Sequence, residues 1–506
     1  MEKVVINSNS STSGSNAAII SLLKTCAKNK DLNEGIKLHG DIVRKGLLLK
    51  DHFVGNTLVN MYAKCGELTK AQEVFNELPI QDIVSWNVLI SGYAHYGHSQ
   101  EAINCFEQMK LKRGLSPNSV TFVCALKACG NLGDCVLGQE IHVEIIKGKL
   151  LTNELVGNAL VNMYAGCGLL GKSREVFDEL SVHNVVSWNA LIAGYAENGN
   201  AREALKCYNL MLKDGISPNS STFVSTLKAC GSIGAEDNGR KIHDEIIKRK
   251  LVGKDLMVGR SLIDMYAKCG AFAKAYEVYR KLPSRDTVSL TALVAGYAKH
   301  GYGEEALKCL EQMQLGSIIP NSVTFICSFK ACSSIGATNK GREIHAEIVR
   351  GQWLEKNSVI GNTLVDMYAK CGLLGKAHEV FNDLPVQNIV SWTTLIAGYV
   401  QNGHSDQALN CFDQMQLKGL MPNAVTFACI LKACGSVGAG EKGEEVHSQI
   451  MREGISVKDI VVGNALIDMY AKCGLLDEAQ EMFKELQAHD VVSWTSLIGG
   501  NVEKGH

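Results

Sequence analysis

The sequence has no apolar run that approaches the roughly 18 to 20 residues needed to cross a bilayer. Its first 15 residues, MEKVVINSNSSTSGS, contain neither an arginine nor an apolar core. This segment therefore lacks the marks of a secretory signal and is a poor transit peptide. Proline is also scarce, at 7 of 506 residues, whereas glycine reaches 49. Few prolines and many glycines are typical of numerous short helices joined by tight turns.

An excess of basic residues is missing as well. The chain has 51 Lys and Arg against 52 Asp and Glu, which gives a net charge of −1 and a pI of about 6.9. Proteins that depend on phosphate contacts usually carry a basic excess. If the ligand is a nucleic acid, much of the affinity must come from contacts with bases, or the basic residues must gather on one face.

The 18 cysteines contain no C-x-x-C pair, which weakens the case for a zinc site. Their spacing is periodic instead. One set recurs every 102 residues, at Cys65, Cys167, Cys269, Cys371 and Cys473. Cysteines that mark repeat positions are not arranged as pairs, so we predict reduced, buried thiols that act as small apolar side chains, and no metal site.

The period of 102 residues is too long for one unit of a solenoid and contains smaller ones. One period divides into segments of 35, 36 and 31 residues, at 185–219, 220–255 and 256–286. In the first segment Trp188, Leu191 and Tyr195 fall at helical spacing, and Gly199 ends the helix. A second apolar stripe follows and ends at Gly215. Neither helix can bury its stripe alone, so neighbouring units must stack to form a continuous core.

The same division covers nearly the whole chain. Units of the 36-residue type lie at 16–51, 119–153, 220–255, 322–357 and 424–459; those of the 31-residue type lie at 52–82, 154–184, 256–286, 358–388 and 460–490; those of the 35-residue type lie at 83–118, 185–219, 287–321 and 389–423. Fourteen units therefore fill 16–490, and 491–506 is a partial unit with one helix. We expect 1–15 to be a disordered N-terminal segment and the rest to be one elongated all-α domain.

Short motifs recur along with this rotation of unit lengths: VVSWN, LKACG, KIH, MYAKCG and SPN. Together they resemble the pentatricopeptide repeat family. The resemblance covers 16–506 and is closest to the land-plant subclass that alternates P, L and S motifs. The 35-, 36- and 31-residue types are called P, L and S units below. The resemblance implies a right-handed α-solenoid superhelix of helix-turn-helix repeats, whose first helices line a concave groove. It also implies a protein without catalytic activity or cofactor that binds single-stranded RNA, one base per repeat.

In this family the base is read by the fifth and the last residue of each P and S motif. In the S units these pairs are Asn56/Asp82, Asn158/Asn184, Arg260/Asp286, Asn362/Asn388 and Asn464/Asp490. In the P units they are Asn87/Asn118, Asn189/Asn219, Thr291/Asn321 and Thr393/Asn423. The fifth residues of the L units, Ile20, Val123, Val224, Ile326 and Ala428, cannot hydrogen-bond a base edge, so those positions should tolerate any base.

The chemistry of the pairs suggests which base each would take. An Asp carboxylate only accepts hydrogen bonds, so it suits the N3–H donor of uracil and repels the N3 acceptor of cytosine. An Asn amide that can turn donates or accepts, so an Asn/Asn pair should tolerate either pyrimidine. Thr is shorter than Asn and leaves room for a purine. The Asn that is the last residue of the same unit can then hydrogen-bond adenine. Arg260 departs from the family pattern, and no base is predicted for it.

These rules predict the RNA target ?-U-Y-?-Y-Y-?-?-A-?-Y-A-?-U from 5′ to 3′, where Y is a pyrimidine and the N-terminal unit binds first. The family also places the second residue of each motif, an apolar one, between neighbouring bases, where stacking is sequence-tolerant. These residues are Phe53, Val84, Leu155, Val186, Met257, Val288, Val359, Val390 and Val461.

Several recurring residues also have a structural interpretation. The Trp residues of the P units, Trp86, Trp188, Trp392 and Trp494, are expected in the core because they keep one repeat position. The last Asn or Asp of a unit is also a good cap for the next helix, so capping and base reading can coexist. Three L units contain an H-x-E triplet, which starts at His142, His243 or His345. This triplet is half of a zinc deaminase signature. The other half, P-C-x-x-C, is absent from the sequence, so the histidines are interpreted as structural.

Two functions are compatible with these sequence features. The first is a specificity factor for RNA processing or C-to-U editing in mitochondria or chloroplasts, as the family implies. The sequence has no C-terminal E or DYW extension, so editing would require a separate deaminase or cofactor protein as partner. The alternative is a helical scaffold that binds a protein, which the near-neutral charge favours slightly. The narrow choice of Asn, Asp and Thr at the paired positions favours RNA.

Overall fold

The structure, a computed structural model, describes residues 10–456, 459–486 and 488–503. Within these residues it contains 31 helices and no strand, which agrees with the all-α prediction. Its contacts divide the chain between Arg249 and Lys250 into two compact parts, called the N-terminal and the C-terminal half below. The sequence predicted a single domain without a break. In a solenoid each unit contacts only its neighbours, so no common core forces the chain into one part.

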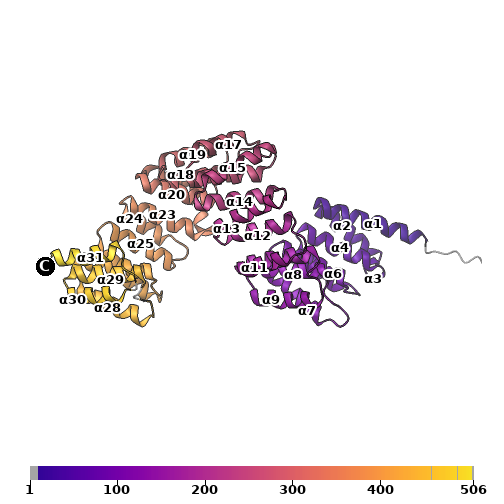
Figure 1. Ribbon diagram of the computed structural model, residues 1–506, viewed down its shortest axis with the longest axis horizontal. Coiled ribbons are helices and arrows are strands. Elements are labelled where there is room, and N and C mark those ends of the chain that lie inside the picture. The colour runs from indigo at the N-terminus through magenta and orange to yellow at the C-terminus, as the bar shows by residue number, and fades with distance from the viewer. Residues whose placement is uncertain (1–9, 457–458, 487, 504–506) are drawn as a thin grey trace, which may run out of the picture. The chain divides into compact units, whose positions relative to one another are not determined.

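The N-terminal half contains α1 (Ser10–Asn29), α2 (Leu32–Arg44), α3 (Leu47–Lys50), α4 (His52–Cys65), α5 (Leu68–Glu77), α6 (Ile83–His95), α7 (Ser99–Leu111), α8 (Ser119–Leu132), α9 (Cys135–Lys147), α10 (Glu154–Gly166), α11 (Leu170–Glu179), α12 (Val185–Glu197), α13 (Ala201–Lys213), α14 (Ser220–Ile233) and α15 (Glu236–Lys248) (Figure 1).

The C-terminal half contains α16 (Leu256–Lys268), α17 (Phe272–Lys281), α18 (Thr287–Lys299), α19 (Gly303–Leu315), α20 (Ser322–Ile335), α21 (Thr338–Arg350), α22 (Trp353–Lys356), α23 (Ser358–Lys370), α24 (Leu374–Asn382), α25 (Ile389–Gln401), α26 (Ser405–Leu417), α27 (Ala424–Val437), α28 (Gly440–Arg452), α29 (Ile460–Cys473), α30 (Leu476–Glu485) and α31 (Val491–Glu503) (Figure 1).

Each repeat unit from 52 onward starts with a helix at its first residue. Helix α12 begins at Val185 because the side chain of Asn184 accepts the backbone N–H groups of Val186 and Ser187 at 2.9 and 3.1 Å. The following turn contains Gly199, whose φ of +80° lies in the left-handed region that glycine adopts without strain. A capping residue at the start and a glycine in the turn after the end therefore set the length of α12.

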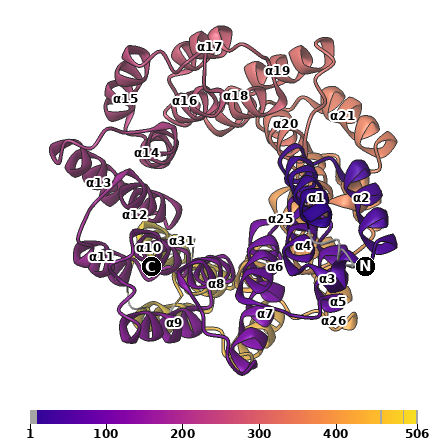
Figure 2. The same ribbon diagram turned by 90° about the vertical axis from the view of Figure 1, so that its right-hand side faces the viewer.

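The helices of each half form two layers. Helix α12 lies against α10 and α14, the first helices of the neighbouring units, and is covered by α13 of its own unit. Figure 2 shows α8, α10 and α12 on one side of α9, α11 and α13, and likewise α16 and α18 on one side of α17 and α19. The first helices of successive units therefore share one layer, and the second helices share the other.

The apolar stripes predicted from the sequence lie between these layers. Trp188 and Leu191 of α12 are buried, as is Met211 of α13. The Trp188 ring meets Phe177 of the preceding unit edge-on, with 4.6 Å between the ring centres, and the same contact recurs at Phe75–Trp86, Phe381–Trp392 and Phe483–Trp494. The core prediction is confirmed for Trp86, Trp188 and Trp392. It is wrong for Trp494, which is 52% exposed because no further described helix covers α31.

The first helices of an S unit and the following P unit approach closely through a glycine. At Gly296 of α18, a Cβ atom would lie 2.6 Å from Cβ of Ala267 in α16 and 2.9 Å from its carbonyl oxygen. Both distances are shorter than nonbonded atoms tolerate. The same Gly–Ala neighbour pair recurs at Gly92–Ala63, Gly194–Ala165, Gly398–Ala369 and Gly500–Ala471. A missing side chain therefore sets the spacing of the first-helix layer.

The recurring histidines of the L units link neighbouring units. His345 Nδ1 lies 3.0 Å from the hydroxyl oxygen of Tyr368 in the following S unit. The equivalent contacts are His39–Tyr62, His142–Tyr164 and His447–Tyr470, at 2.9, 2.8 and 2.8 Å. Burial lowers the pKa of each of these four histidines below 6.5, so the neutral ring is favoured. These contacts agree with the structural interpretation of the H-x-E triplets that begin at His142 and His345.

All 18 cysteines are free thiols, but only half of them are buried as predicted. Burial raises the pKa of Cys105 to about 11 and that of Cys129 to about 12, so both remain protonated. The set at Cys65, Cys167, Cys269, Cys371 and Cys473 is half-buried instead. These thiols lie in the last turn of an S-unit first helix or at its C-cap, where the chain leaves the core.

The N-terminal helix starts earlier than the repeat pattern indicated. Helix α1 begins at Ser10 rather than at residue 16, inside the segment that was expected to be disordered. Extending an existing helix adds one hydrogen bond per residue at little cost, so a polar segment can continue a helix that apolar residues nucleate. Residues 1–9 lie outside the described residues. No helix among the described residues is long and apolar enough to span a membrane.

The Gly–Ala spacing can be tested by adding one methyl group. Gly296→Ala should lower the urea midpoint of unfolding, with a loss of about 1–3 kcal/mol from overpacking. The matched control is Gly375→Ala in α24, where an added Cβ would have no neighbour within 4 Å. That control should leave the midpoint unchanged or raise it slightly, because Ala favours helix more than Gly. Equal effects of the two variants would contradict the packing argument.

The histidine contacts predict how stability depends on pH. The folded chain holds these four rings at a pKa below the ordinary value of 6.5, so on acidification the unfolded chain binds protons first. Stability should be constant above about pH 7 and fall as the pH drops through 6.5. Urea unfolding between pH 8 and pH 5 measures this. His345→Gln should make the decline shallower, and an unchanged slope would contradict the assignment.

Candidate nucleic-acid interface

The candidate interface lies where one repeat unit ends and the next first helix begins. The last residue of a P or S unit is the N-cap of the following helix, so its side chain must point at free N–H groups. All nine last residues named from the sequence accept a backbone N–H in this way: Asp82, Asn118, Asn184, Asn219, Asp286, Asn321, Asn388, Asn423 and Asp490. The cap therefore holds these side chains in place before any ligand binds.

Two S units bring an Asn and an Asp together. Nδ2 of Asn56 lies 3.1 and 3.2 Å from the two carboxylate oxygens of Asp82. Asn464 and Asp490 repeat this contact at 3.0 and 3.2 Å. Oδ1 of each Asn is buried and has no hydrogen-bond partner among the described residues. The backbone N–H of Ser493 is the largest cause that lowers the pKa of Asp490, so this carboxylate is ionised and only accepts hydrogen bonds.

Two P units join two Asn side chains through a threonine of the next unit. Asn87 donates from Nδ2 to Oδ1 of Asn118 at 3.1 Å. Thr121 donates its hydroxyl to Oδ1 of Asn87 at 2.6 Å, and its backbone N–H to Oδ1 of Asn118 at 3.1 Å. Asn189, Asn219 and Thr222 repeat these three contacts at 3.0, 2.6 and 3.0 Å. The fifth residue, the last residue and the next helix thus form one polar cluster.

The cap fixes which way the last amide faces. A backbone N–H can only donate, so Oδ1 of Asn118 must face Thr121, and Nδ2 must face away. The same holds for Asn219, Asn321 and Asn423, which cap their helices in the same manner. The expectation that these amides turn freely is therefore wrong for the last residues of the P units. Each of them presents a donor, whereas Asp at the same position of an S unit presents an acceptor.

Two P units replace the fifth Asn with Thr. The hydroxyl of Thr291 donates to the carbonyl of Thr287 at 2.6 Å and lies 2.7 Å from the hydroxyl of Thr324. Thr393 makes the same contact with Thr426 at 2.7 Å. Both threonine hydroxyls are thus occupied within the protein. The hydrogen-bonding groups that remain for a ligand at these two sites are mainly the amide nitrogens of Asn321 and Asn423, which make no hydrogen bond within the described residues.

Two other predicted pairs are not joined by a hydrogen bond within the described residues. Asn184 donates from Nδ2 to Oε2 of Glu154 at 3.1 Å, rather than contacting Asn158. Asn388 caps α25, and no hydrogen bond links it to Asn362. Both of these S units end in Asn, whereas the S units whose fifth and last residues are joined end in Asp.

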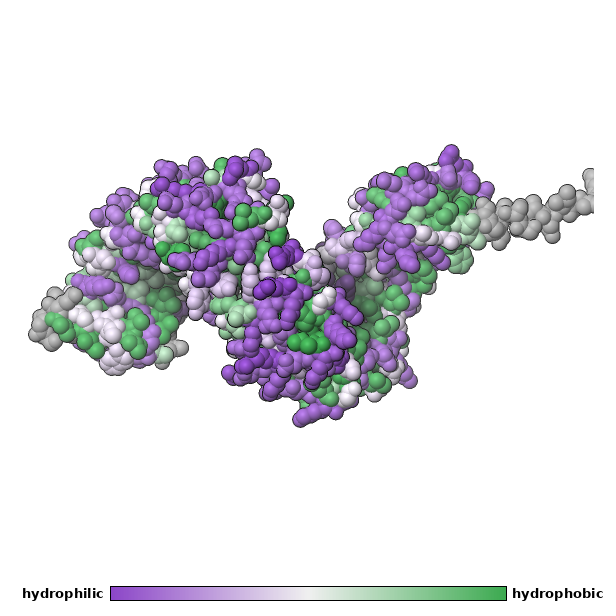
Figure 3. Space-filling view, turned by 90° about the horizontal axis from the view of Figure 1, so that it is seen from above, coloured by the Kyte–Doolittle hydropathy of each residue, from purple (hydrophilic) through white to green (hydrophobic). Residues whose placement is uncertain are grey.

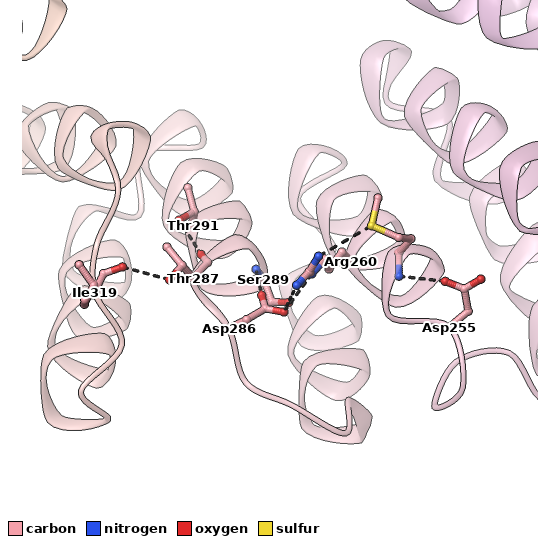
Figure 4. Close-up of polar contacts among 8 residues, drawn as sticks. Asp255, Arg260, Asp286, Thr287, Ser289, Thr291 and Ile319 are labelled. Atoms are coloured by element: carbon pink, nitrogen blue, oxygen red, sulfur yellow. Dashed lines mark hydrogen bonds and ion pairs between the residues drawn. The ribbon is translucent and has the colours of Figure 1, made fainter. Parts of the chain in front are cut away.

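The pair of Arg260 and Asp286 is an ion pair. Nη2 of the guanidinium lies 2.6 Å from Oδ2 of the carboxylate, and Oδ1 caps α18 through the N–H of Ser289 at 2.8 Å (Figure 4). Burial alone would raise the pKa of Asp286. The hydrogen bonds from Ser289 and Arg260 outweigh burial and lower the pKa below its ordinary value.

The second residues of the P and S units are exposed although they are apolar. Their exposed fractions lie between 51 and 66% for Phe53, Val84, Leu155, Val186, Met257, Val288, Val359, Val390 and Val461. The face in Figure 3 likewise shows apolar patches among hydrophilic side chains. Three L units add Val120, Val323 and Val425, which are 48–54% exposed and which were not predicted from the sequence. Their signal was available, because they hold the same second position of the unit.

A pocket joins these features at one P unit. It has a volume of about 390 Å³, and its lining includes Val84, Asn87, Asn118 and Val120. Two exposed valines, one from each of two successive first helices, thus flank a pair of amides. Lys64 lines the same pocket. The arrangement offers apolar surface for a flat ring, hydrogen-bonding groups for its edge and one positive charge.

The lysines at this position of the S units are not equivalent. Lys268, Lys370 and Lys472 form ion pairs with an Asp four residues earlier, at 2.7–2.8 Å. Lys64 has Asn60 at that place and makes no ion pair within the described residues. It is therefore the lysine of this set with the most free positive charge, which the sequence signals by Asn in place of Asp. Among the described residues no group of three potential ligands could hold a metal ion.

The fifth residues of the L units cannot read a base edge through their side chains. Ile20, Val123, Val224, Ile326 and Ala428 are half-buried and carry no polar side-chain atom. They lie in the same first-helix layer as the polar pairs, so every third unit lacks a hydrogen-bonding group at this position.

Comparison with known proteins identifies the repeats. A family model described as the PPR repeat family matches residues 81–131, 183–232, 285–334 and 387–436, and a model of the PPR repeat matches 56–81, 260–286, 362–389 and 464–491. The chain is 36% identical over 454 residues to the pentatricopeptide repeat-containing protein At4g18520, chloroplastic, of Arabidopsis thaliana, covering 90% of this chain and 73% of that protein.

Other relatives are longer. The chain is 32% identical to At1g15510, chloroplastic, and 34% identical to At3g09040, mitochondrial, both from Arabidopsis thaliana. It covers 55% and 47% of their lengths, so it spans about half of these two proteins. Among solved structures, the pentatricopeptide repeat protein PPR10 in complex with an 18-nt psaJ RNA element matches 97% of this chain and 77% of that chain. The TM-score of 0.59 at 20% identity establishes a shared fold.

The capping role of the paired residues predicts two different outcomes at one position. Asn219→Ala removes the side chain that caps α14 and should lower stability by about 1 kcal/mol. Asn219→Asp keeps an oxygen for the N–H of Thr222 and should leave stability nearly unchanged. Urea unfolding measures both, with Asn209→Ala on exposed α13 surface as the control. A loss for Asn219→Asp as large as that for Asn219→Ala would contradict the capping assignment.

Proposed function

Because the chain belongs to the pentatricopeptide repeat family, we propose that it binds single-stranded RNA and reads one base with each P or S unit. The observation that carries this proposal is the arrangement of Asn87 and Asn118 between Val84 and Val120 around one pocket. Exposed valines would stack on a base, which is sequence-tolerant, while the amides would select its edge. PPR10, which shares the fold, has been solved with bound RNA, and this supports the proposal.

The last residue of each unit would select the base by its fixed polarity. The carboxylate of Asp82 or Asp490 accepts hydrogen bonds and suits the N3–H of uracil. The capped amide of Asn118 or Asn219 donates, so it suits the N3 and O2 acceptors of cytosine better than the N3–H of uracil. The Y positions of the P units should therefore lean towards cytosine.

The remaining positions follow the same logic. At the two Thr units, the donor amides of Asn321 and Asn423 suit N1 of adenine, and the shorter Thr leaves room for the purine. The proposed target remains ?-U-Y-?-Y-Y-?-?-A-?-Y-A-?-U, with the L units tolerant of any base. Since the net charge is −1, base contacts must supply much of the affinity. Lys64 is the first candidate for a phosphate contact.

We further propose that the chain belongs to the subclass that alternates P, L and S motifs and acts as a specificity factor in organellar RNA processing, such as C-to-U editing. The rotation of unit lengths supports the subclass. Names of relatives that end in chloroplastic or mitochondrial support the compartment. In this proposal a separate deaminase or cofactor protein supplies the catalysis, and the RNA sequence bound by this chain specifies the site.

The proposal is tested with synthetic 14-nucleotide RNAs and gel-shift titration. Replacing adenine at the ninth or twelfth position with cytosine should weaken binding roughly tenfold, as expected when about 1.4 kcal/mol of contact is lost. Thr291→Asn should move the preference at the ninth position from adenine to a pyrimidine. The unchanged Thr393 unit is the internal control, because its preference for adenine at the twelfth position should persist.

Equal affinity for every one of these RNAs would overturn the base-reading proposal. No measurable binding of any RNA, together with a protein captured through the same first-helix face, would favour the alternative scaffold function. Thermal unfolding of Thr291→Asn checks that the variant is folded, and the fold is expected to persist because Asn stands at this position in two other P units.

A further inference from the structure

The S unit at 256–286 carries a base-reading position unlike any other in the chain. Its fifth residue is Arg260 on α16, where the other S units have Asn. The guanidinium lies against the carboxylate of Asp286, with Nε at 2.9 Å and Nη2 at 2.6 Å from Oδ2 (Figure 4). Asp286 itself is held by the start of α18, because its Oδ1 accepts the N–H of Ser289. The arginine is therefore positioned by a group that is already fixed.

The guanidinium also contacts the residue expected to stack on a base. Nη1 of Arg260 lies 3.8 Å from Sδ of Met257, the exposed second residue of the same unit. The side chains of Arg260 and Asp286 are 25% and 21% exposed, so the ion pair is partly shielded from water but open to a ligand. The charged group thus touches both features that define a reading position elsewhere, the stacking residue and the last residue.

Hydrogen-bond counting shows what this group can still bind. A guanidinium has five N–H donors and no acceptor. The carboxylate takes one from Nε and one from Nη2, and Nη1 directs a third to Sδ of Met257. Two N–H donors remain, one on Nη1 and one on Nη2. Two parallel donors on one edge match a ligand with two neighbouring acceptors.

The S units at 52–82 and 460–490 present acceptors to a ligand rather than donors. At Asn56 and Asn464 the amide donates to the Asp and leaves Oδ1 as an unpaired acceptor. That Oδ1 is buried, so the acceptor a ligand meets there is the Asp carboxylate, which suits the N3–H of uracil. At Arg260 the corresponding acceptor is replaced by a cation, and the neighbouring carboxylate is neutralised by the ion pair. The N3–H of uracil would face donors, so uracil should be disfavoured.

The four bases differ in how they meet such an edge. Guanine has O6 and N7 side by side, and arginine most often recognises this pair of acceptors in nucleic-acid complexes. Adenine places the N6 amino donor beside N7, and uracil places N3–H between its two acceptors. Cytosine has neighbouring O2 and N3 acceptors, but its smaller ring would cover less of Met257. Guanine therefore combines two acceptors with the larger stacking surface.

We propose that the unit at 256–286 selects guanine, through two hydrogen bonds from the Arg260 guanidinium to O6 and N7, with Asp286 holding the arginine in place. The inference rests on the proposed function, because it assumes that the units read RNA bases. It assigns the eighth nucleotide of the target, which neither the family pattern nor the sequence chemistry specified.

The test uses the full chain and four 14-nucleotide RNAs that match the proposed target and differ only at the eighth position. Gel-shift titration should show guanine bound roughly tenfold more tightly than uracil. A second set of four RNAs carries the same changes at the eighth position and also has cytosine in place of uracil at the fourteenth position. Comparing the two sets measures base selection by Asn464 and Asp490 in the same protein. That substitution should weaken binding whatever base stands at the eighth position.

Two variants separate the geometry of arginine from its charge. Arg260→Lys keeps the positive charge but loses the two parallel N–H donors of the guanidinium. The overall affinity should therefore remain while the preference for guanine falls. Arg260→Asn makes the same pair as the units at 52–82 and 460–490, so the preference at the eighth position should shift to uracil. Since that pair already exists twice in the chain, the variant is expected to fold, and circular dichroism verifies this.

The outcomes are distinct. A preference for uracil, adenine or cytosine at the eighth position overturns the assignment of guanine. So does an absence of preference there while the fourteenth position still discriminates, and in that case the proposed function stands. An absence of discrimination at both positions removes the proposed function and this inference together. A preference for guanine that Arg260→Lys retains in full would overturn the role of the bidentate contact.

Discussion

The N-cap hydrogen bond between the last residue of one repeat unit and the first turn of the next is the interaction on which the rest of this structure depends. It starts each first helix and fixes where the next unit begins. It also decides which atoms of the last side chain remain for a ligand. Because Oδ1 of Asn118 is committed to Thr121, only the amide nitrogen is left. Local folding and ligand chemistry are therefore properties of the same atoms.

A second constraint spaces these caps along each half. Glycines such as Gly296 allow adjacent first helices to approach as closely as their backbones permit. In the same layer, the second residues Val84 and Val120 of two successive first helices line one pocket together with Asn87. The spacing results from packing in the first-helix layer, far from the hydrogen-bonding groups that it positions.

Much of this arrangement follows from the sequence. The helix starts, the buried Trp positions and the nine capping residues are local features with strong signals, because period, cap and glycine all agree. The sequence could not give the orientation of the Asn118 amide, which depends on Thr121 in the next unit. Nor could it show that Asn184 turns to Glu154, or that Arg260 forms an ion pair with Asp286, since these contacts join residues of ordinary type at a distance. The exposure of Trp494 and the half-burial of Cys167 depend on what covers each helix end, which residue type alone does not encode.

The shared use of one side chain for cap and ligand has an evolutionary consequence. Asn and Asp cap a helix about equally well, and their codons differ by a single nucleotide. Under the proposed reading, one point mutation at Asn118 would therefore change the polarity offered to a base without weakening the helix that follows. Such a protein can drift from one RNA sequence to another through stable intermediates, which removes the usual conflict between acquiring a new specificity and staying folded.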